Sequence, residues 1–276
     1  MSNLENKNPA TKEFAEQLEI NYNMSQIKNK IIVLSGKGGV GKSSVAVNTA
    51  VGLALEGYQV GLVDIDIHGP SVPKMLGLMN CEPKVVNNQV EPIKYSDNLK
   101  VMSISFMMEN PEDPIVWRGP LKMNVIKQFL HDVNWGDLDY LVVDSPPGTG
   151  DEPLSICQLI ENPQGAIIVT TPQDVALNDV KKSIKFCSMI KCPVIGVVEN
   201  MSTFICPHCN QSTDIFKSGG GDRMAKEMNV PFLGSIPLDL NIVLSGDDSK
   251  PFVHFNPDSE STRSFKQILE KVIDYK

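Results

Sequence analysis

The sequence predicts an α/β fold, with a single doubly wound, mostly parallel sheet flanked by helices. Seven apolar, β-rich runs recur along the chain, and segments with a helical pattern separate most of them. The runs are nearly continuous in apolar character, as is typical of parallel strands buried on both faces. Strands that alternate with helices in this way favour one doubly wound domain. The runs cover residues 31–35, 59–66, 99–105, 139–147, 165–172, 192–200 and 231–237.

The segments between the runs carry apolar stripes at helical spacing. Residues 43–56 form such a stripe and stop before Gly57, a residue type that commonly follows a helix. Residues 121–133 and 175–190 show the same pattern. The C-terminal segment 261–276 has one apolar face and a polar face of mixed charge, so we expect it to pack on the domain and not on a membrane.

Two segments depart from the strand–helix alternation. Residues 1–28 are polar and weakly periodic, and we expect a flexible or partly helical arm with a short helix over 11–18. The remaining chain, 29–276, is predicted to form one domain. Residues 83–95 are predicted to form a β-hairpin that turns at Asn87–Asn88.

Composition restricts the surroundings in which the protein works. The chain has 276 residues and a formal net charge of -8, which argues against binding a nucleic-acid backbone. No apolar run approaches the roughly 18 residues of a membrane span, and the N-terminus resembles neither a secretory signal nor an organelle transit peptide. The six cysteines are scattered and do not suggest a disulfide framework. We therefore expect a cytoplasmic protein that binds neither nucleic acid nor membrane.

A glycine-rich loop follows the first strand and opens the first regular helix. Residues 36–43 fit the phosphate-loop pattern G-x-x-x-x-G-K-[ST]. The glycines let backbone N–H groups surround a phosphate chain, and the helix N-terminus favours negative charge. Lys42 should reach the β- and γ-phosphates, and the Ser43 hydroxyl should ligate Mg²⁺. The predicted nucleotide-binding residues here are Gly36, Lys37, Gly38, Gly39, Val40, Gly41, Lys42, Ser43 and Ser44.

Acidic residues end two of the predicted strands. Asp64 and Asp66 lie at the end of one run, and Asp144 lies near the end of another, before a Pro-Pro-Gly turn. Open α/β sheets bind ligands at the carboxyl ends of their strands. An aspartate such as Asp144 holds the metal through water in phosphate-loop proteins. These three carboxylates are therefore candidates for the same site as the phosphate loop.

A Cys-x-x-Cys motif, "FICPHC", lies at residues 204–209. Its spacing directs the thiolates of Cys206 and Cys209 to one point, but zinc and iron–sulfur sites usually have four protein ligands. A second copy of the chain, related by a two-fold axis, could supply the other two. A zinc ion, a thiol–disulfide centre and a plain turn remain open at this point. We expect His208 to be solvated and not a ligand.

The other four cysteines show no metal-knuckle spacing, and we expect each to be a buried core residue. They are Cys81, Cys157, Cys187 and Cys192.

The motifs together resemble a known family. "KGGVGKSS" carries an extra lysine, Lys37, and resembles the deviant Walker A (SIMIBI) class of P-loop NTPases, which includes MinD, ParA and the nitrogenase iron protein. "DIDIHGPSVPKMLG", "WRGPLKMNVIKQFL", "WGDLDYLVVDSPPGTGDEPLS", "VVENMSTFICPHC" and "GSIPLDLNI" narrow the resemblance to the Mrp/ApbC iron–sulfur cluster carriers. The similarity spans about residues 28–275, in order and without large gaps.

The resemblance implies roles for particular residues. Lys37 would cross a dimer interface and stabilise phosphate charge on the partner, with Lys42 acting in the same chain. Asp66 would position or activate the attacking water, with Asp64 near the metal and Asp144 in the second switch loop. Three further residues would lie near the adenine base: Asn200, Pro237 and Asp239.

The resemblance also implies a function. The expected protein is a slow ATPase that binds ATP, Mg²⁺ and a [4Fe–4S] cluster, with Cys206 and Cys209 of two subunits holding the cluster at a homodimer interface. It would receive the cluster from a donor scaffold and transfer it to apo-proteins. The alternatives are a MinD/ParA-like positioning ATPase and a zinc-bridged dimeric ATPase. The acidic charge and the Cys-x-x-Cys motif disfavour the positioning ATPase.

Overall fold

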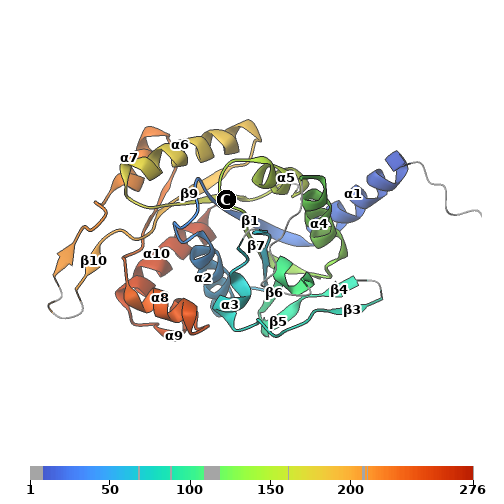
Figure 1. Ribbon diagram of the computed structural model, residues 1–276, viewed down its shortest axis with the longest axis horizontal. Coiled ribbons are helices and arrows are strands. Elements are labelled where there is room, and N and C mark those ends of the chain that lie inside the picture. Colours follow the sequence, from blue (N-terminus) through green and yellow to red (C-terminus); the bar gives the residue numbers. More distant parts are fainter. Residues whose placement is uncertain are drawn as a thin grey trace, which may run out of the picture.

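The computed structural model describes residues 9–67, 69–87, 89–108, 119–160, 162–206, 209 and 211–275. An eight-stranded sheet runs through the described part of the chain, and helices cover both of its faces (Figure 1). The strand order is β12-β9-β8-β1-β7-β2-β6-β5. All neighbouring pairs are parallel except β5 and β6. The strands are β1 (Ile27–Ser35), β2 (Val60–Asp64), β5 (Ile93–Ser96), β6 (Leu99–Ser103), β7 (Leu138–Asp144), β8 (Gly165–Thr170), β9 (Val194–Glu199) and β12 (Phe232–Ser235).

The helices divide between two hydrophobic cores, one on each face of the sheet. Side chains of α1, α4, α5, α6 and α7 pack in one core, and side chains of α2, α3, α9 and α10 pack in the other. The helices are α1 (Pro9–Ser25), α2 (Lys42–Leu55), α3 (Val72–Leu76), α4 (Gly119–Asp132), α5 (Asp151–Leu159), α6 (Asp174–Met189), α7 (Gly220–Glu227), α8 (Leu240–Asp247), α9 (Phe252–Phe255) and α10 (Glu260–Asp274), with a 3₁₀ turn at Ile104–Met107. The predicted doubly wound α/β class and each of its seven predicted strands are confirmed.

Helix α1 is longer than the helix expected over 11–18. Its later turns place Ile20 and Met24 in the core beneath α4. Asn23 donates to the carbonyls of Leu130 and His131 at the end of α4, at 3.4 and 2.7 Å. Tertiary packing of this kind extends helices whose own sequence is only weakly periodic.

The segment 83–95 forms two structures. Strands β3 (Lys84–Val86) and β4 (Gln89–Glu91) pair antiparallel as the expected hairpin, and β5 then returns to the edge of the main sheet. Asn87 has a φ of 50°, as a tight turn requires, whereas Asn88 lies outside the described residues.

The register of the central strands brings the acidic residues to one edge. Val33 of β1 lies beside Asp144 of β7, and Asp144 lies beside Asp64 of β2. All three strands are parallel, so the loops that follow them meet at the carboxyl edge of the sheet. The glycine-rich loop after β1 is therefore next to both aspartates.

Candidate nucleotide site and thiol hairpin

The phosphate loop joins β1 to α2, and its shape depends on glycine. Gly39 and Gly41 have φ values of 77° and 82°, in the left-handed region that glycine adopts at no steric cost. Gly41 caps α2, and a Cβ atom at this position would lie 2.1 Å from Nδ2 of Asn200. That amide nitrogen donates to the carbonyl oxygen of Val40 at 2.9 Å. Asn200 therefore fixes the loop at the start of the helix.

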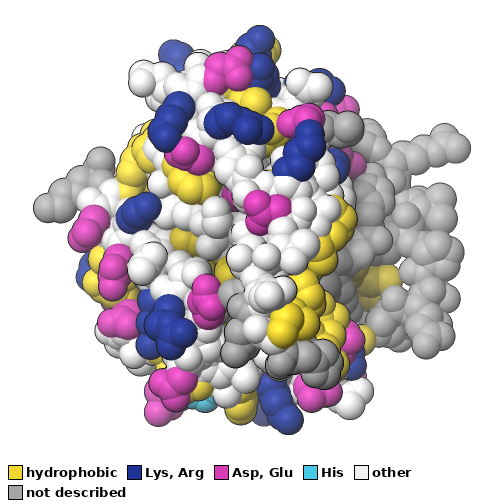
Figure 2. Space-filling model, turned by 90° about the vertical axis from the view of Figure 1, so that its left-hand side faces the viewer, with side chains coloured by type: hydrophobic (Ala, Val, Ile, Leu, Met, Phe, Trp, Pro, Cys, Tyr) yellow, Lys and Arg dark blue, Asp and Glu magenta, His cyan; other side chains and the backbone are white. Residues whose placement is uncertain are grey.

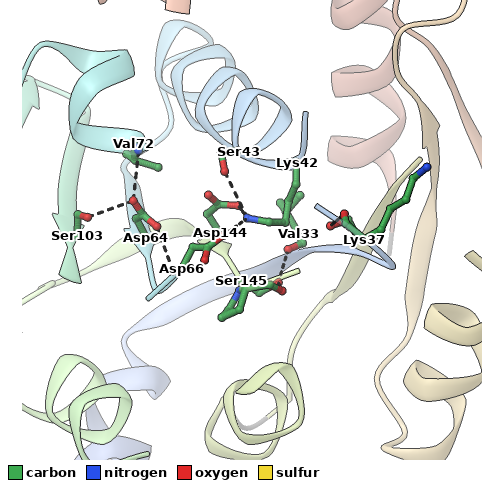
Figure 3. A network of polar contacts seen from close by, with 12 residues as sticks. Val33, Lys37, Lys42, Ser43, Asp64, Asp66, Val72, Ser103, Asp144 and Ser145 are labelled. Carbon is green, nitrogen blue, oxygen red and sulfur yellow. Dashed lines mark hydrogen bonds and ion pairs between the residues drawn. The ribbon is translucent and has the colours of Figure 1, made fainter. Parts of the chain in front are cut away.

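Lys42 lies at the centre of the polar network (Figure 3). Its Nζ is 2.5 Å from Oδ1 of Asp144 and 3.5 Å from Oδ2 of Asp66, and it donates to Oγ of Ser43 at 3.3 Å. Burial raises the pKa of Asp144, although the ion pair with Lys42 acts in the opposite direction. Because all three side chains are buried, these charges interact strongly. An entering phosphate would compete with the two carboxylates for the same ammonium group.

Asp64 organises the loop that follows β2. Its Oδ1 accepts from the backbone N–H of Asp66 at 3.1 Å, and its Oδ2 accepts from the N–H of Val72 and the hydroxyl of Ser103 at 3.2 and 3.1 Å. Burial, followed by the nearby charge of Asp144, raises the pKa of Asp64 to about 8. The side chain thus holds Asp66 and the start of α3 in place. The sequence motif did not reveal Val72 or Ser103 as its partners.

The described oxygen donors around Asp144 fit a hard cation. Oδ2 of Asp144 is buried and accepts no hydrogen bond from the residues that the structure describes. The Ser43 hydroxyl lies beside the same network (Figure 3). Hydroxyl and carboxylate oxygens of this kind are the ligands that Mg²⁺ takes, directly or through water.

Lys37 points away from this network. Its side chain extends from the loop on the side opposite the carboxylates (Figure 3), and it is half-buried. The Ser35 hydroxyl holds its backbone by donating to the Lys37 carbonyl at 3.0 Å. Gly36 lies against α6, where an added Cβ would be 2.4 Å from Cβ of Asp179. Only glycine fits at this approach, and the ammonium of Lys37 is directed away from the site of its own chain.

A pocket of about 310 Å³ opens beside the phosphate loop. Ser44, Asn200, Pro237 and Asp239 line it, together with apolar side chains that include Met75 and Ile242. A largely apolar pocket with a few polar groups is suited to a flat aromatic ring. The structure thus brings together all the residues that the sequence proposed for the base.

The carboxylate of Asp239 is already engaged within the chain. It caps α8 by accepting from the N–H of Asn241 at 2.8 Å, and it accepts from the hydroxyl of Ser261 at 2.6 Å. These bonds fix the loop that carries Pro237. Asp239 therefore shapes the pocket through the backbone.

The two motif cysteines lie on a separate hairpin (Figure 1). Strands β10 (Phe204–Ile205) and β11 (Ser212–Thr213) pair antiparallel, and the N–H of Cys206 donates to the carbonyl of Gln211 at 3.0 Å. Cys206 is half-buried and Cys209 is exposed. His208 lies outside the described residues. The face of the molecule that carries the hairpin displays interspersed acidic and basic side chains (Figure 2).

Backbone pairing connects this hairpin to the pocket. The N–H of Ser202 donates to the carbonyl of Ile236, and the N–H of Leu238 donates to the carbonyl of Thr203, both at 3.0 Å. Phe204 and Leu238 form a parallel bridge. The segment 200–206 thus begins at a pocket residue, pairs with the pocket loop 236–238, and ends at Cys206.

The hairpin is also fastened at its base. Asp214 accepts from the hydroxyls of Thr203 and Ser218, at 2.8 and 2.6 Å. The Ser218 bond and then the Thr203 bond lower the pKa of Asp214 below its usual range.

Within the described part of the chain, no group of three or more His, Cys, Asp or Glu side chains is arranged to hold a metal ion. Among the described residues, a metal site on the hairpin would therefore have two thiol ligands from this chain, Cys206 and Cys209.

The parallel sheet, the glycine-rich loop at its carboxyl edge and the lysine–carboxylate network define a P-loop nucleoside triphosphatase. A family model described as "ParA: NUBPL iron-transfer P-loop NTPase" matches residues 26–273. The chain belongs to this family of iron-transfer P-loop NTPases.

Relatives with curated names agree with this assignment. The chain is 49% identical over 268 residues to the iron–sulfur cluster carrier protein of Methanocaldococcus jannaschii, covering 96% of this chain and 92% of the relative. It is 47% identical over 253 residues to the "Cytosolic Fe-S cluster assembly factor NUBP2 homolog" of Nematostella vectensis, covering 90% and 94%. These matches confirm the resemblance to the iron–sulfur cluster carriers.

Solved structures show the same fold. A nucleotide-binding protein from Archaeoglobus fulgidus in complex with ADP has a TM-score of 0.76 and 38% identity, covering 85% of this chain and 92% of that chain. MinD from Pyrococcus horikoshii, complexed with Mg-ADP, has a TM-score of 0.66 and 22% identity, covering 90% and 96%. The second likeness shows the fold alone. None of the described helices is both long enough and apolar enough to span a membrane.

Proposed function

We propose that the chain is an ATP-hydrolysing carrier that holds a [4Fe–4S] cluster between two copies of itself and transfers it to apo-proteins. The pairing of segment 202–204 with the pocket loop 236–238 carries this proposal. A nucleotide that shifts the pocket loop would shift the strand leading to Cys206. Nucleotide state and cluster exposure would then be coupled through a single backbone segment.

Hydrolysis would use residues from two chains. Lys42 binds the phosphates in its own chain, while Lys37, which points away from the local network, reaches the nucleotide of the partner copy. Asp66, held by Asp64, orients the attacking water. Mg²⁺, held through Ser43 and Asp144, would neutralise phosphate charge. Few groups activate the water, so slow turnover is expected.

Cargo binding follows from the number of thiols. Two cysteines in each chain supply half of the four ligands that a [4Fe–4S] cluster takes. A two-fold axis beside the hairpins would complete the set, and ATP bound across the same dimer would reinforce it. The exposed position of Cys209 suits a cluster that is received from a donor scaffold and given up to a client. Cysteine ligands and a labile cluster also suit the reducing cytoplasm.

One observation supports a carrier over a MinD/ParA-like positioning ATPase. The apolar face of α10 is buried in the domain core, with Phe265 and Ile268 each 1% exposed, and so is not free to lie on a membrane. Zinc remains the competing cargo, because thiolates bind both metals.

Anaerobic reconstitution with iron and sulfide tests the proposal. We expect a coloured dimer with one [4Fe–4S] cluster for two chains, and loss of that colour in Cys206→Ser. Cys81→Ser is the matched control, since Cys81 is a half-buried cysteine away from the hairpin. Transfer to an apo-protein should depend on ATP in the wild type and fail in Lys42→Ala. A coloured monomer, or zinc bound in preference to iron, would contradict the proposal.

A further inference from the structure

The segments that enter and leave the hairpin of β10 and β11 meet at one buried residue, Glu199. This residue ends strand β9, and its side chain is 0% exposed. The chain enters the hairpin directly from Glu199, through residues 200–203. It leaves the hairpin after β11 through residues 214–219 and continues into helix α7. Glu199 is therefore placed to hold both segments.

The carboxylate of Glu199 holds the leaving segment. Its Oε1 accepts from the backbone N–H of Gly219 at 3.0 Å, and its Oε2 accepts from the N–H of Gly221 at 2.6 Å. Both donors belong to the N-terminal end of α7, where unpaired N–H groups favour a negative charge. Hydrogen bonds to an ionised acceptor are roughly twice as strong as bonds between neutral groups. The start of α7 is thus fastened to the end of β9.

Glycine allows α7 to begin this close to the carboxylate. A Cβ atom at Gly221 would lie 3.0 Å from Cβ of Glu199 and 3.2 Å from its Oε2. A Cβ atom at Gly220 would lie 2.7 Å from the carbonyl oxygen of Pro172. A side chain at either position would therefore move the start of α7 away from Glu199.

Glu199 also contacts the pocket loop. The N–H of Ile236 donates to the carbonyl oxygen of Glu199 at 2.8 Å, and the Ser235 hydroxyl is 3.5 Å from Oε1. Asn200, the next residue, lines the nucleotide pocket and donates to the carbonyl of Val40 in the phosphate loop. A shift of the pocket residues would thus reach Glu199 without an intermediate segment.

The leaving segment is held at its other end by Asp214. Asp214 follows β11 directly and accepts from the hydroxyl of Ser218, the residue before Gly219. The motif cysteines differ in their connection to these segments. Cys206 follows β10 on the entering side, whereas Cys209 lies in the turn before β11.

We propose that Glu199 is a positioning residue that makes both sides of the hairpin follow the nucleotide pocket. With its carboxylate in place, the entering and leaving segments move together with the end of β9. Without it, the entering segment still follows through its pairing with residues 236–238, but the leaving segment does not. Cys209 would then lose its response to nucleotide. This inference rests on the nucleotide coupling of the proposed function and assigns a residue to it.

Alkylation of the metal-free chain tests this role, because it follows the hairpin without requiring a cluster. The full chain is treated briefly with iodoacetamide, with or without saturating ADP and Mg²⁺, and fragment masses give the rate at each cysteine. In the wild type we expect ADP to change the rates at Cys206 and Cys209 by at least about fivefold. In Glu199→Gln, an amide nitrogen replaces one acceptor oxygen, so Cys209 should no longer respond to ADP. The affinity for ADP should stay the same.

The remaining cysteines are internal references for a general change in exposure. Cys187 and Cys192 are buried, as the sequence predicts, whereas Cys81 and Cys157 are half-buried. Their rates should be the same in the wild type and in Glu199→Gln.

Two further variants sharpen the test. Glu227→Gln is the matched control, because Glu227 ends the same helix α7 but is exposed and pairs with Lys181 at 2.6 Å. It should respond to ADP as the wild type does. Gly221→Ala keeps the charge of Glu199 but displaces the start of α7, so it should also lose the response at Cys209. This variant decides the question if Glu199→Gln does not fold.

The outcomes separate this inference from the proposed function. A wild-type response at Cys209 in Glu199→Gln or in Gly221→Ala would overturn the role of Glu199 and leave the proposed function standing. If neither motif cysteine of the wild type responded to ADP, the nucleotide coupling of the proposed function would be wrong as well. Failure of the chain to bind iron would contradict the proposed function alone, because the thiols are measured without metal.

Discussion

Lys42 is shared by two buried carboxylates, and this determines how the nucleotide site can work. Its ammonium group lies between Asp144 and Asp66, with the Ser43 hydroxyl beside it. An incoming phosphate must replace at least one of these partners. The carboxylates are then available to a metal ion and to water, which is the arrangement that phosphoryl transfer uses. In the proposed function, binding of the nucleotide and assembly of the hydrolytic site would therefore be the same event.

Replacing each of the two lysines of the loop should have a different effect on ADP binding and on hydrolysis. We expect Lys37→Ala to bind ADP with nearly wild-type affinity but to lose hydrolysis by about 10³-fold, as when a finger residue is removed. Lys42→Ala should instead weaken ADP binding by at least about tenfold, because charged hydrogen bonds to phosphate are lost. Calorimetry and phosphate release measure the two effects. Equal loss of ADP binding in both variants would refute the separate roles.

Asp64 predicts a dependence of stability on pH. In the unfolded chain the pKa of Asp64 is near 3.8, but burial raises its pKa in the folded protein to about 8. The folded state keeps an extra proton between these values, so the stability that the proton contributes is lost as pH rises through 8. Wild-type stability should fall by up to about 1.4 kcal/mol per pH unit from pH 6 to 8, and Asp64→Asn should fall less.

Urea unfolding without nucleotide or Mg²⁺ measures this difference. Asp97→Asn is the control, because the hydrogen bond with Lys94 lowers the pKa of Asp97 and keeps it ionised across that range. Parallel curves for wild type and Asp64→Asn would show that Asp64 does not retain the proton.

The hairpin of β10 and β11 is the element that connects the pocket beside the phosphate loop to the two motif cysteines. Its strands are only two residues each, so their own pairing contributes little stability. The bonds from Ser202 and Leu238 to the opposite backbone, and those from Thr203 and Ser218 to Asp214, hold it instead. The hairpin therefore depends on the pocket loop for its position.

Asp214→Ala should loosen the hairpin without affecting the pocket. We expect reconstituted iron to be retained about threefold less, because two hydroxyls lose their acceptor. Asp97→Ala is the control. Asp97 is also an exposed carboxyl, but its ion-pair partner is Lys94 and it lies in the turn between β5 and β6. Iron analysis after gel filtration gives the comparison, and ADP affinity should stay the same. Equal iron retention by both variants would count against the role of Asp214.

Elements with strong local patterns were predictable from the sequence. The seven apolar runs and the stripes of α2, α4, α6 and α10 appear close to their predicted bounds. The full length of α1 was not predictable from the sequence, because burial of Ile20 and Met24 against α4 stabilises turns whose own pattern is weak. The strands of the thiol hairpin were not predicted either, since two polar residues in β11 carry no periodic signal.

The candidate site divides in the same way. The sequence placed Lys42 in a phosphate-loop motif and the three aspartates at the ends of predicted strands, and the structure brings Lys42, Asp64, Asp66 and Asp144 together. The contacts of Asp64 with Ser103 arise from neighbouring strands, and no local pattern encodes them.

At the scale of the whole molecule, the two-chain cluster predicts how mixed dimers behave. A chain carrying both Cys206→Ser and Cys209→Ser contributes no thiol to the shared site. In an equal mixture with wild type, about a quarter of randomly formed dimers should hold a cluster. Iron content per dimer against the fraction of wild type should therefore follow a square law. A straight line through the origin would mean that each chain holds its own cluster.

The pairing of residues 202–204 with residues 236–238 restricts which insertions this chain can accept during evolution. Side chains along an extended segment alternate between two sides, so one inserted residue would turn every later side chain to the opposite side. The side chain of Cys206 would then lie on the opposite side of the segment. The stretch between Asn200 and Cys206 should accept new residue types but not a new length, and insertions should accumulate elsewhere.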